Sequence, residues 1–244
     1  MRRLCVATAV TAALSLTTPS WAGPPFLTDD PEPTDVGHWE IYAPLLEVDG
    51  RGADYGGAVG AELNYGARPG MQVTVGLPLS FAHDRAGFTS GRGDLEFSVK
   101  YRFVHDQAHG ISVAAFPGAT LPTGARALSA HRVTALLPVW AQKNVGPWSV
   151  FGGGGYALNP GRGNRNYWTG GLAVTRAVTP HLLLGLEADR QGADTRIGRM
   201  STSFGAGGIL QISRTFRILT SAGPTFGNGG RPAFHGYLAG GLNF

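Results

Sequence analysis

Apolar and polar side chains alternate along most of the chain, and the stretch from Asp94 to Phe103 shows the pattern most clearly. Its odd-numbered positions are all apolar and its even-numbered positions are all polar. A period of two residues is typical of a β-strand, because successive side chains point to opposite faces of a sheet. One face of this segment therefore meets an apolar environment and the other a polar one.

The same alternation divides the chain after residue 37 into about twelve runs of strand length, separated by turn residues. The runs lie near residues 38–47, 54–66, 71–83, 92–104, 110–121, 130–142, 147–158, 166–178, 181–191, 199–213, 216–226 and 233–244. Strands of ordinary globular proteins have about 5–6 residues, whereas a tilted strand that crosses the hydrocarbon layer needs about 9–11. Tight turns alternate with longer loops such as 84–91 and 122–129, so we expect the longer loops at one end of the sheet.

The first residues have the pattern of a secretory signal peptide. Two arginines after Met1 precede an apolar stretch, and small residues stand before a cleavage site at Ala22. The apolar stretch, which ends at Leu16, is too short to span a bilayer as a helix. Its removal takes away Cys5, the only cysteine, and lowers the formal charge from +4 to +2, because two arginines are lost. This near-neutral balance predicts no nucleic-acid partner.

The apolar face alone would suit the dry core of a soluble sandwich equally well. Composition and the ends of the chain favour a membrane barrel instead. The chain has 38 glycines and only 15% charged residues, and aromatic residues gather at strand ends. Because lipid offers backbone groups no partner, a sheet crosses a membrane only as a closed barrel. Together with the signal peptide, the even strand number and the terminal Phe244, this predicts an all-β fold, a transmembrane antiparallel up-and-down barrel of about twelve strands over residues 38–244.

The polar face of the strands would line the interior of this barrel. The predicted lumen-lining residues are Glu40, Glu62, Asp94, Glu96, Lys100, Arg102, Arg132, Glu187, Asp189, Arg199 and Arg217. Mixed signs predict a pore of weak ion selectivity, and the alternative is a closed interior in which the charges pair for stability. Arg176 is an exception, since it shares its face with apolar residues. It lies near a strand end, where it can reach the interface, unless a bulge changes the parity.

Residues 23–37 form an acidic leader ahead of the first strand, with too much proline for regular structure. It could fold back into the barrel as a plug, or chelate a cation, through Asp29, Asp30, Glu32 and Asp35. The alternative is a disordered periplasmic arm. Arg102 and Arg217 are candidate partners of a plug, because both are expected on the inner face near the periplasmic end.

Two short stretches resemble known sequences. The run from Tyr237 to Phe244 resembles the C-terminal signal that the outer-membrane assembly machinery recognises: Leu242 and Phe244 match it, while Ala239 stands where glycine is more usual. Residues 25–31, followed by Gly37-His38-Trp39-Glu40, resemble the start of the family of transporters of the phenol-degradation meta-pathway type. The resemblance implies an outer-membrane channel for small organic molecules, aromatic or hydrophobic ones included.

This interpretation places the protein in the bacterial outer membrane, with both ends of the mature chain in the periplasm. The expected partners are outer-membrane lipid and lipopolysaccharide, the barrel-assembly machinery and a small-molecule permeant. No nucleic acid is expected among them.

Candidate catalytic residues are few. Ser129 and His131 stand beside an outer loop and His235 lies on the last strand, but no third, orienting acid is apparent. No histidine has metal-ligand spacing, and the glycines at 152–155 lack the Lys-Ser or Lys-Thr of a phosphate loop. The sequence therefore predicts no enzyme, metal or cofactor, but passive passage of a small molecule. The alternatives are a lipid-modifying enzyme that acts at the rim and a structural barrel without traffic.

Overall fold

The computed structural model describes residues 25–227 and 232–244, so the predicted signal peptide at 1–22 lies outside the described residues. No helix in these ranges is long and apolar enough to span a membrane. The strands are β1 (Trp39–Arg51), β2 (Asp54–Arg68), β3 (Met71–Asp84), β4 (Gly87–Arg92), β5 (Leu95–Asp106), β6 (Ile111–Ala115), β7 (Gly118–Leu121), β8 (Thr134–Val145), β9 (Trp148–Leu158), β10 (Tyr167–Thr179), β11 (Leu182–Gln191), β12 (Ser201–Gln211), β13 (Phe216–Gly227) and β14 (Ala233–Asn243).

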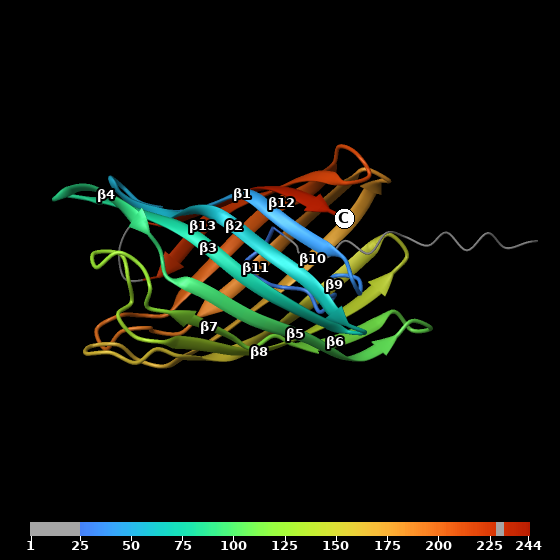
Figure 1. The fold of residues 1–244 in the computed structure, drawn as a ribbon, viewed down its shortest axis with the longest axis horizontal. Coiled ribbons are helices and arrows are strands. Elements are labelled where there is room, and N and C mark those ends of the chain that lie inside the picture. Colours follow the sequence, from blue (N-terminus) through green and yellow to red (C-terminus); the bar gives the residue numbers. More distant parts are fainter. Residues whose placement is uncertain (1–24, 228–231) are drawn as a thin grey trace, which may run out of the picture.

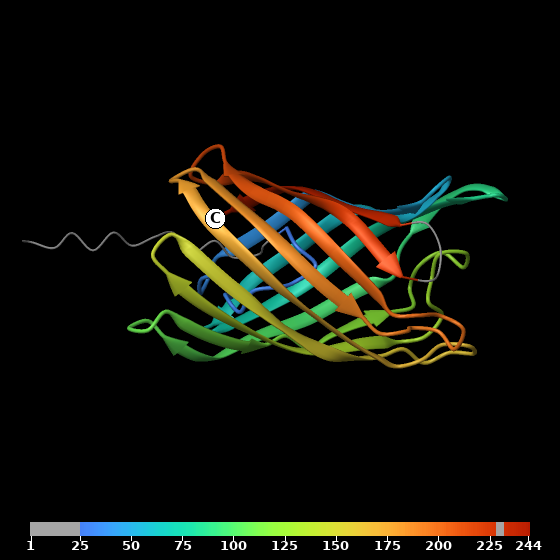
Figure 2. The ribbon, with the colours of Figure 1, turned by 180° about the vertical axis from the view of Figure 1, so that it is seen from behind.

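These strands form a closed antiparallel barrel. Consecutive positions in the wall pair antiparallel, and the pairing of β1 with β14 and of β3 with β5 closes the sheet on itself. β4 and β5 pair with successive parts of β3 and share one position in the wall, and β6 and β7 share another between β5 and β8. The barrel of the described residues therefore has twelve strand positions, and the predicted fold class is confirmed. Figures 1 and 2 show the tilted strands from opposite sides.

The structure corrects the prediction of a loop at 84–91. Gly87–Arg92 forms β4, which pairs with β3 from Leu79 to Asp84. Asp84 Oδ1 accepts a hydrogen bond from the Ala86 amide at 2.7 Å, and Gly87 has a φ of 118°, which allows a tight hairpin turn. The short alternation in β4 does not stand out in the sequence, because it follows directly on the turn residues.

The outward face of the barrel is apolar, as the alternation predicts. Leu137, Leu186 and Leu238 are 51%, 66% and 49% exposed on the bare barrel, which is the position of lipid-facing side chains. Arg176 also points outward, near the end of β10, and its guanidinium lies 5.2 Å from the centroid of the Trp148 ring. The exception to the pattern is therefore a cation–π pair at a strand end, where interfacial residues are expected.

A bulge in β1 changes which face its second half presents. The register with both neighbouring strands shifts between Tyr42 and Leu45. The sequence predicts Leu45 on the outward face, but it packs against the buried cluster around Tyr42 inside the barrel. Glu47 and Asp49 follow it onto the inner face, where they line cavities. Strict alternation fails here because an inserted residue reverses the parity.

The two ends of the barrel differ in their connections. The connections at the turn end are residues 69–70, 107–110, 146–147, 180–181 and 212–215. At the opposite, loop end, the connections at 122–133, 159–166 and 192–200 are longer, while 52–53 and 85–86 are tight hairpin turns. Trp39 begins β1 at the turn end, and its amide donates to the carbonyl of Phe244 at 2.7 Å. The barrel therefore starts and finishes at the turn end, with Leu242 and Phe244 exposed on the outer face. Their recognition by the assembly machinery stays a prediction.

Candidate functional site

The inner face of the barrel is polar. Most of the predicted lumen residues lie on strands with their side chains on this face: Glu40, Glu62, Glu96, Lys100, Arg102, Glu187, Asp189 and Arg217. Their placement follows the alternation read from the sequence. That they line a conducting pore stays a prediction.

Asp94, Arg132 and Arg199 lie outside the strands, unlike the prediction. Asp94 stands in the break between β4 and β5 and accepts hydrogen bonds from the amides of Gly124 and Ala130, each at 2.8 Å. Burial disfavours its charged form, but these hydrogen bonds outweigh burial and hold the pKa of Asp94 below its ordinary value. Arg132 and Arg199 are exposed in loops ahead of β8 and β12. The predicted strands start too early there, because the loop residues continue the alternation.

The acidic leader lies inside the barrel. Figure 2 shows its first part, in blue, enclosed by the strands. Pro25 and Thr28 are among the least exposed residues of the described chain. Glu187 of β11 accepts hydrogen bonds from the amides of Leu27 and Thr28 at 3.1 and 3.0 Å, and Ser221 of β13 donates to the carbonyl of Pro25. The leader thus occupies the lumen and is bound to its wall through backbone groups.

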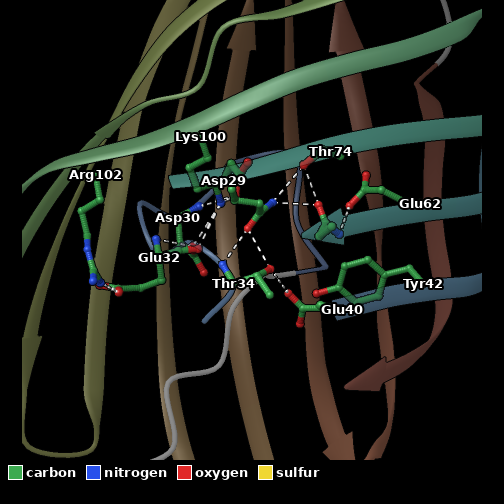
Figure 3. A network of polar contacts seen from close by, with 12 residues as sticks. Asp29, Asp30, Glu32, Thr34, Glu40, Tyr42, Glu62, Thr74, Lys100 and Arg102 are labelled. Carbon is green, nitrogen blue, oxygen red and sulfur yellow. Dashed lines mark hydrogen bonds and ion pairs between the residues drawn. The ribbon is translucent and has the colours of Figure 1, made fainter. Parts of the chain in front are cut away.

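Two cations of β5 hold the acidic part of the leader (Figure 3). Lys100 Nζ lies 3.0 Å from Asp29 Oδ1 and 3.5 Å from Asp30 Oδ1, and donates to the carbonyl of Glu32 at 3.4 Å. Arg102 pairs with the carboxylate of Glu32. Lys100 is only 2% exposed, so the leader carboxylates supply the compensation that its buried charge requires.

The last part of the leader joins a network of uncharged side chains on β2 and β3. The amide of Thr34 donates to Gln72 Oε1 at 2.8 Å, and Gln72 Nε2 donates to Asn64 Oδ1 at 2.7 Å. Thr74 donates to the same Asn64 oxygen at 2.6 Å. Asp35, the fourth acid predicted for a plug, follows this network and is exposed. The buried polar groups at this point therefore satisfy one another.

A second buried ion pair braces the wall beside the leader. Arg217 pairs with Glu40 of β1 and donates to the hydroxyl of Tyr42 at 2.8 Å. Glu40 Oε2 in turn lies 3.4 Å from Thr34 Oγ1. Of the two arginines predicted to hold a plug, Arg102 thus pairs with the leader, whereas Arg217 pairs with the wall and reaches the leader through Glu40.

Glycines in the wall leave room for the leader. A Cβ atom at Gly185 would lie 2.8 Å from Cζ of Phe26, and one at Gly171 would overlap the hydroxyl of Thr28. Distances this short do not occur between real side chains, so larger residues would displace the leader or the wall. The wall is shaped to the leader at these positions.

The leader lies between two cavities of the lumen, and smaller ones adjoin it. The larger, of about 780 Å³, lies toward the loop end, and Leu27 of the leader contributes to its lining. The smaller, of about 430 Å³, lies toward the turn end and is lined by Asp30 and Glu32. A molecule that passes along the barrel axis would have to cross the leader.

The residues considered for catalysis make local contacts. Ser129 Oγ accepts a hydrogen bond from the amide of His131 at 3.1 Å, within the loop ahead of β8. His235 lies on the inner face of β14, where its Nδ1 is 3.3 Å from Thr225 Oγ1. Within residues 25–227 and 232–244, no group of three or more His, Cys, Asp or Glu is placed to hold a metal.

Sequence reasoning missed the uncharged part of the site. Asn64, Gln72 and Thr74 are between 1% and 5% exposed and face inward. They share the polar parity of β2 and β3, so the alternation carried a signal, but it does not distinguish them from other polar residues. Glu47 and Asp49 had no such signal, because the bulge in β1 hides their direction.

The chain matches no known protein family and no curated protein by sequence. Its fold resembles solved structures. The COG4313 outer membrane channel from Pseudomonas putida F1 aligns with a TM-score of 0.73 at 16% identity, over 88% of this chain and 98% of the other. The translocator domain of the autotransporter NalP from Neisseria meningitidis aligns with a TM-score of 0.57 at 13% identity, over 86% and 89% of the two chains. A KdgM porin in complex with disordered oligogalacturonate gives 0.57 at 8% identity, over 84% and 99%. The chain therefore has the fold of the bacterial outer-membrane β-barrels.

Proposed function

We propose that the protein is a channel of the bacterial outer membrane for passive passage of a small organic molecule, and that the leader closes it from within. The observation that carries this proposal is the leader itself, which separates two cavities of the lumen and is bound to the wall by hydrogen bonds and ion pairs. These contacts are noncovalent, so the leader can be displaced from the lumen without any change to the wall.

The arrangement of the ends supports an orientation. Outer-membrane barrels have short periplasmic turns and longer extracellular loops. In this orientation, the turn end and both ends of the mature chain face the periplasm, and the larger cavity faces the exterior. The leader then enters from the periplasmic side, where a change in its position would open the barrel.

The similarity to channels supports transport as the role of the barrel. Transport is also favoured over catalysis by the contacts of the Ser129 hydroxyl. It accepts from the His131 amide and donates to the Asp94 carboxylate, whereas a serine nucleophile donates to a histidine ring. The resemblance of residues 25–31 to transporters of the phenol-degradation meta-pathway type extends the range of permeants to aromatic and hydrophobic molecules.

Single-channel conductance in planar bilayers tests the proposal. The mature protein should show low or intermittent conductance, and a variant that lacks residues 25–35 should show steady conductance that is several-fold higher. A matched control replaces residues 25–35 by glycine and serine at the same length, which keeps a tether but removes every specific contact. It should behave like the deletion. Silence in all three proteins would contradict a channel and favour a closed structural barrel.

A further inference from the structure

The cavity on the loop side has an unusual set of charges. Its lining contains the carboxylates of Asp49, Glu62, Glu96, Asp189 and Asp194. Among the described residues that line it there is no lysine and no arginine. Lys100, Arg102 and Arg217, on the inner face of the strands, are paired with carboxylates at the level of the leader. The larger cavity is therefore acidic, although the lumen as a whole carries both signs.

Two of these carboxylates lie on strands that flank a glycine. Glu62 on β2 and Glu96 on β5 are both register partners of Gly76 on the intervening strand β3. A Cβ atom at Gly76 would lie 3.0 Å from Glu96 Oε2, so the glycine makes room for the Glu96 carboxylate. The carboxylates of Glu62 and Glu96 thus come from strands on either side of Gly76, and both line the cavity.

A buried histidine adds an independent observation. His235 lines the same cavity and is only 5% exposed, yet its Nε2 atom has no hydrogen-bond partner among the described residues. His235 is also the register partner of Asp49. When Nδ1 donates to Thr225 Oγ1, 3.3 Å away, Nε2 keeps a free lone pair. A buried nitrogen of this kind requires a donor, which a bound ligand can supply.

We propose that the loop-side cavity is a binding site for small organic ammonium ions. Carboxylates in a cleft with low-dielectric walls attract cations, and an ammonium group donates hydrogen bonds to carboxylates and to a neutral histidine nitrogen. Trp140 and Tyr167 in the lining offer apolar surface for the carbon part of the ligand. A cavity of about 780 Å³ fits a ligand of modest size, since small-molecule sites span roughly 300–1,000 Å³. This inference rests on the proposed channel only for its consequence, that organic cations are the preferred permeants.

Three probes of nearly equal size isolate the charge: benzylamine, benzyl alcohol and benzoate. Binding to the refolded mature protein, measured by calorimetry at low ionic strength, should rank the amine at least tenfold above the alcohol, with benzoate weakest. The variant Glu62→Gln/Glu96→Gln should lose most of this preference. The matched control is Asp54→Asn/Asp84→Asn, which also removes two carboxylates, at exposed positions that do not line the cavity. The control should keep the preference for the amine.

A second measurement separates this site from the channel itself. Benzylamine added on the loop side should block the single-channel current of the mature protein, and benzoate should not. Binding of the amine without any conductance would leave the site in place and contradict the channel. Conductance with equal affinity for the three probes would leave the channel in place and overturn the ammonium site.

Discussion

The two parts of the lumen treat charge in opposite ways. At the level of the leader, the cations Lys100, Arg102 and Arg217 each face a carboxylate at contact distance. On the loop side, carboxylates line a cavity that has no lysine and no arginine among the described residues of its lining. A buried charge with a fixed partner holds a segment in place, whereas a set of like charges without fixed partners attracts a mobile ion. The contrast indicates that one region of the lumen is built to close and the other to bind.

The largest effect should come from breaking the ion pairs of the leader. The variant Asp29→Asn/Asp30→Asn/Glu32→Gln leaves Lys100 and Arg102 without their partners, and breaking one buried pair costs about 3–5 kcal/mol. The leader should leave the lumen, so single-channel conductance should rise to that of the leader deletion. Asp35→Asn serves as the control, because Asp35 is exposed, and it should leave the conductance unchanged. A triple variant that conducts like the unmodified protein would show that the ion pairs do not hold the leader.

A smaller effect is expected from crowding the space that the leader occupies. Gly185→Val would place side-chain atoms against Phe26, and overpacking of this kind costs about 1–3 kcal/mol. The open fraction in single-channel records should rise. Adding Phe26→Ala removes the clash with the leader and keeps the 2.7 Å approach to Cγ2 of Thr175 in the wall. The open fraction should therefore fall again. If the double variant opened as much as the single one, the effect would come from the wall rather than from the leader.

Ion selectivity should change when the leader is removed. The interaction energy between a permeating ion and each lumen charge is less than about 1 kcal/mol in solvated surroundings, so the change should be small. Deletion of residues 25–35 takes away three lumen carboxylates and leaves Lys100 and Arg102 without partners. The reversal potential in a salt gradient should therefore move toward anions. Adding Lys100→Met to the deletion should move it back toward cations, whereas Lys143→Met, at the end of β8 on an exposed position, should not. Equal reversal potentials with and without the leader would contradict the proposed pairing.

The wall of the larger cavity offers a complementary test of selectivity. Glu62→Lys or Glu96→Lys should shift the reversal potential of the conducting protein toward anions, because each change reverses a charge in the acidic region. An unchanged reversal potential would mean that these side chains do not face the conducting path.

The smallest expected effect concerns the loop that Asp94 holds. Its pKa is lower in the folded protein than the unfolded value of about 3.9, so the hydrogen bonds to Gly124 and Ala130 are at full strength above that pH. Their contribution is lost as the pH falls through the folded pKa. Protection of these two amides from hydrogen exchange, corrected for intrinsic rates, should be constant above about pH 4 and should fall below it. Asp94→Ala should remove this pH dependence, and the same profile in the variant would contradict the assignment.

Much of this architecture could be predicted from sequence, because a barrel wall repeats one rule. The period of two is enough to assign Glu62, Glu96 and Lys100 to the inner face and Leu137 and Leu186 to the outer face, where the folded chain has them. The rule depends only on backbone geometry, so it holds wherever a strand is regular.

The rule fails where the backbone is irregular. The bulge between Tyr42 and Leu45 depends on pairing with two partner strands, which local sequence does not show. The position of the leader depends on distant partners as well: Asp29 and Lys100 are 71 residues apart. The sequence offered both the plug and the free arm for residues 23–37, because its acids and prolines suit either. The facing cations, the glycines at 171 and 185 and the hydrogen bonds to Glu187 and Gln72 distinguish them in the folded chain.

The central claim is that the leader closes the lumen and can leave it, and a reversible cross-link tests this most directly. The pair Thr28→Cys/Gly171→Cys joins the leader to the wall where the two already touch, and the only native cysteine, Cys5, lies in the predicted signal peptide. Single-channel conductance should be low in the oxidised protein and should rise several-fold on reduction, while each single-cysteine variant should not respond to reduction. The same conductance before and after reduction, with the cross-link verified by mass, would contradict the claim.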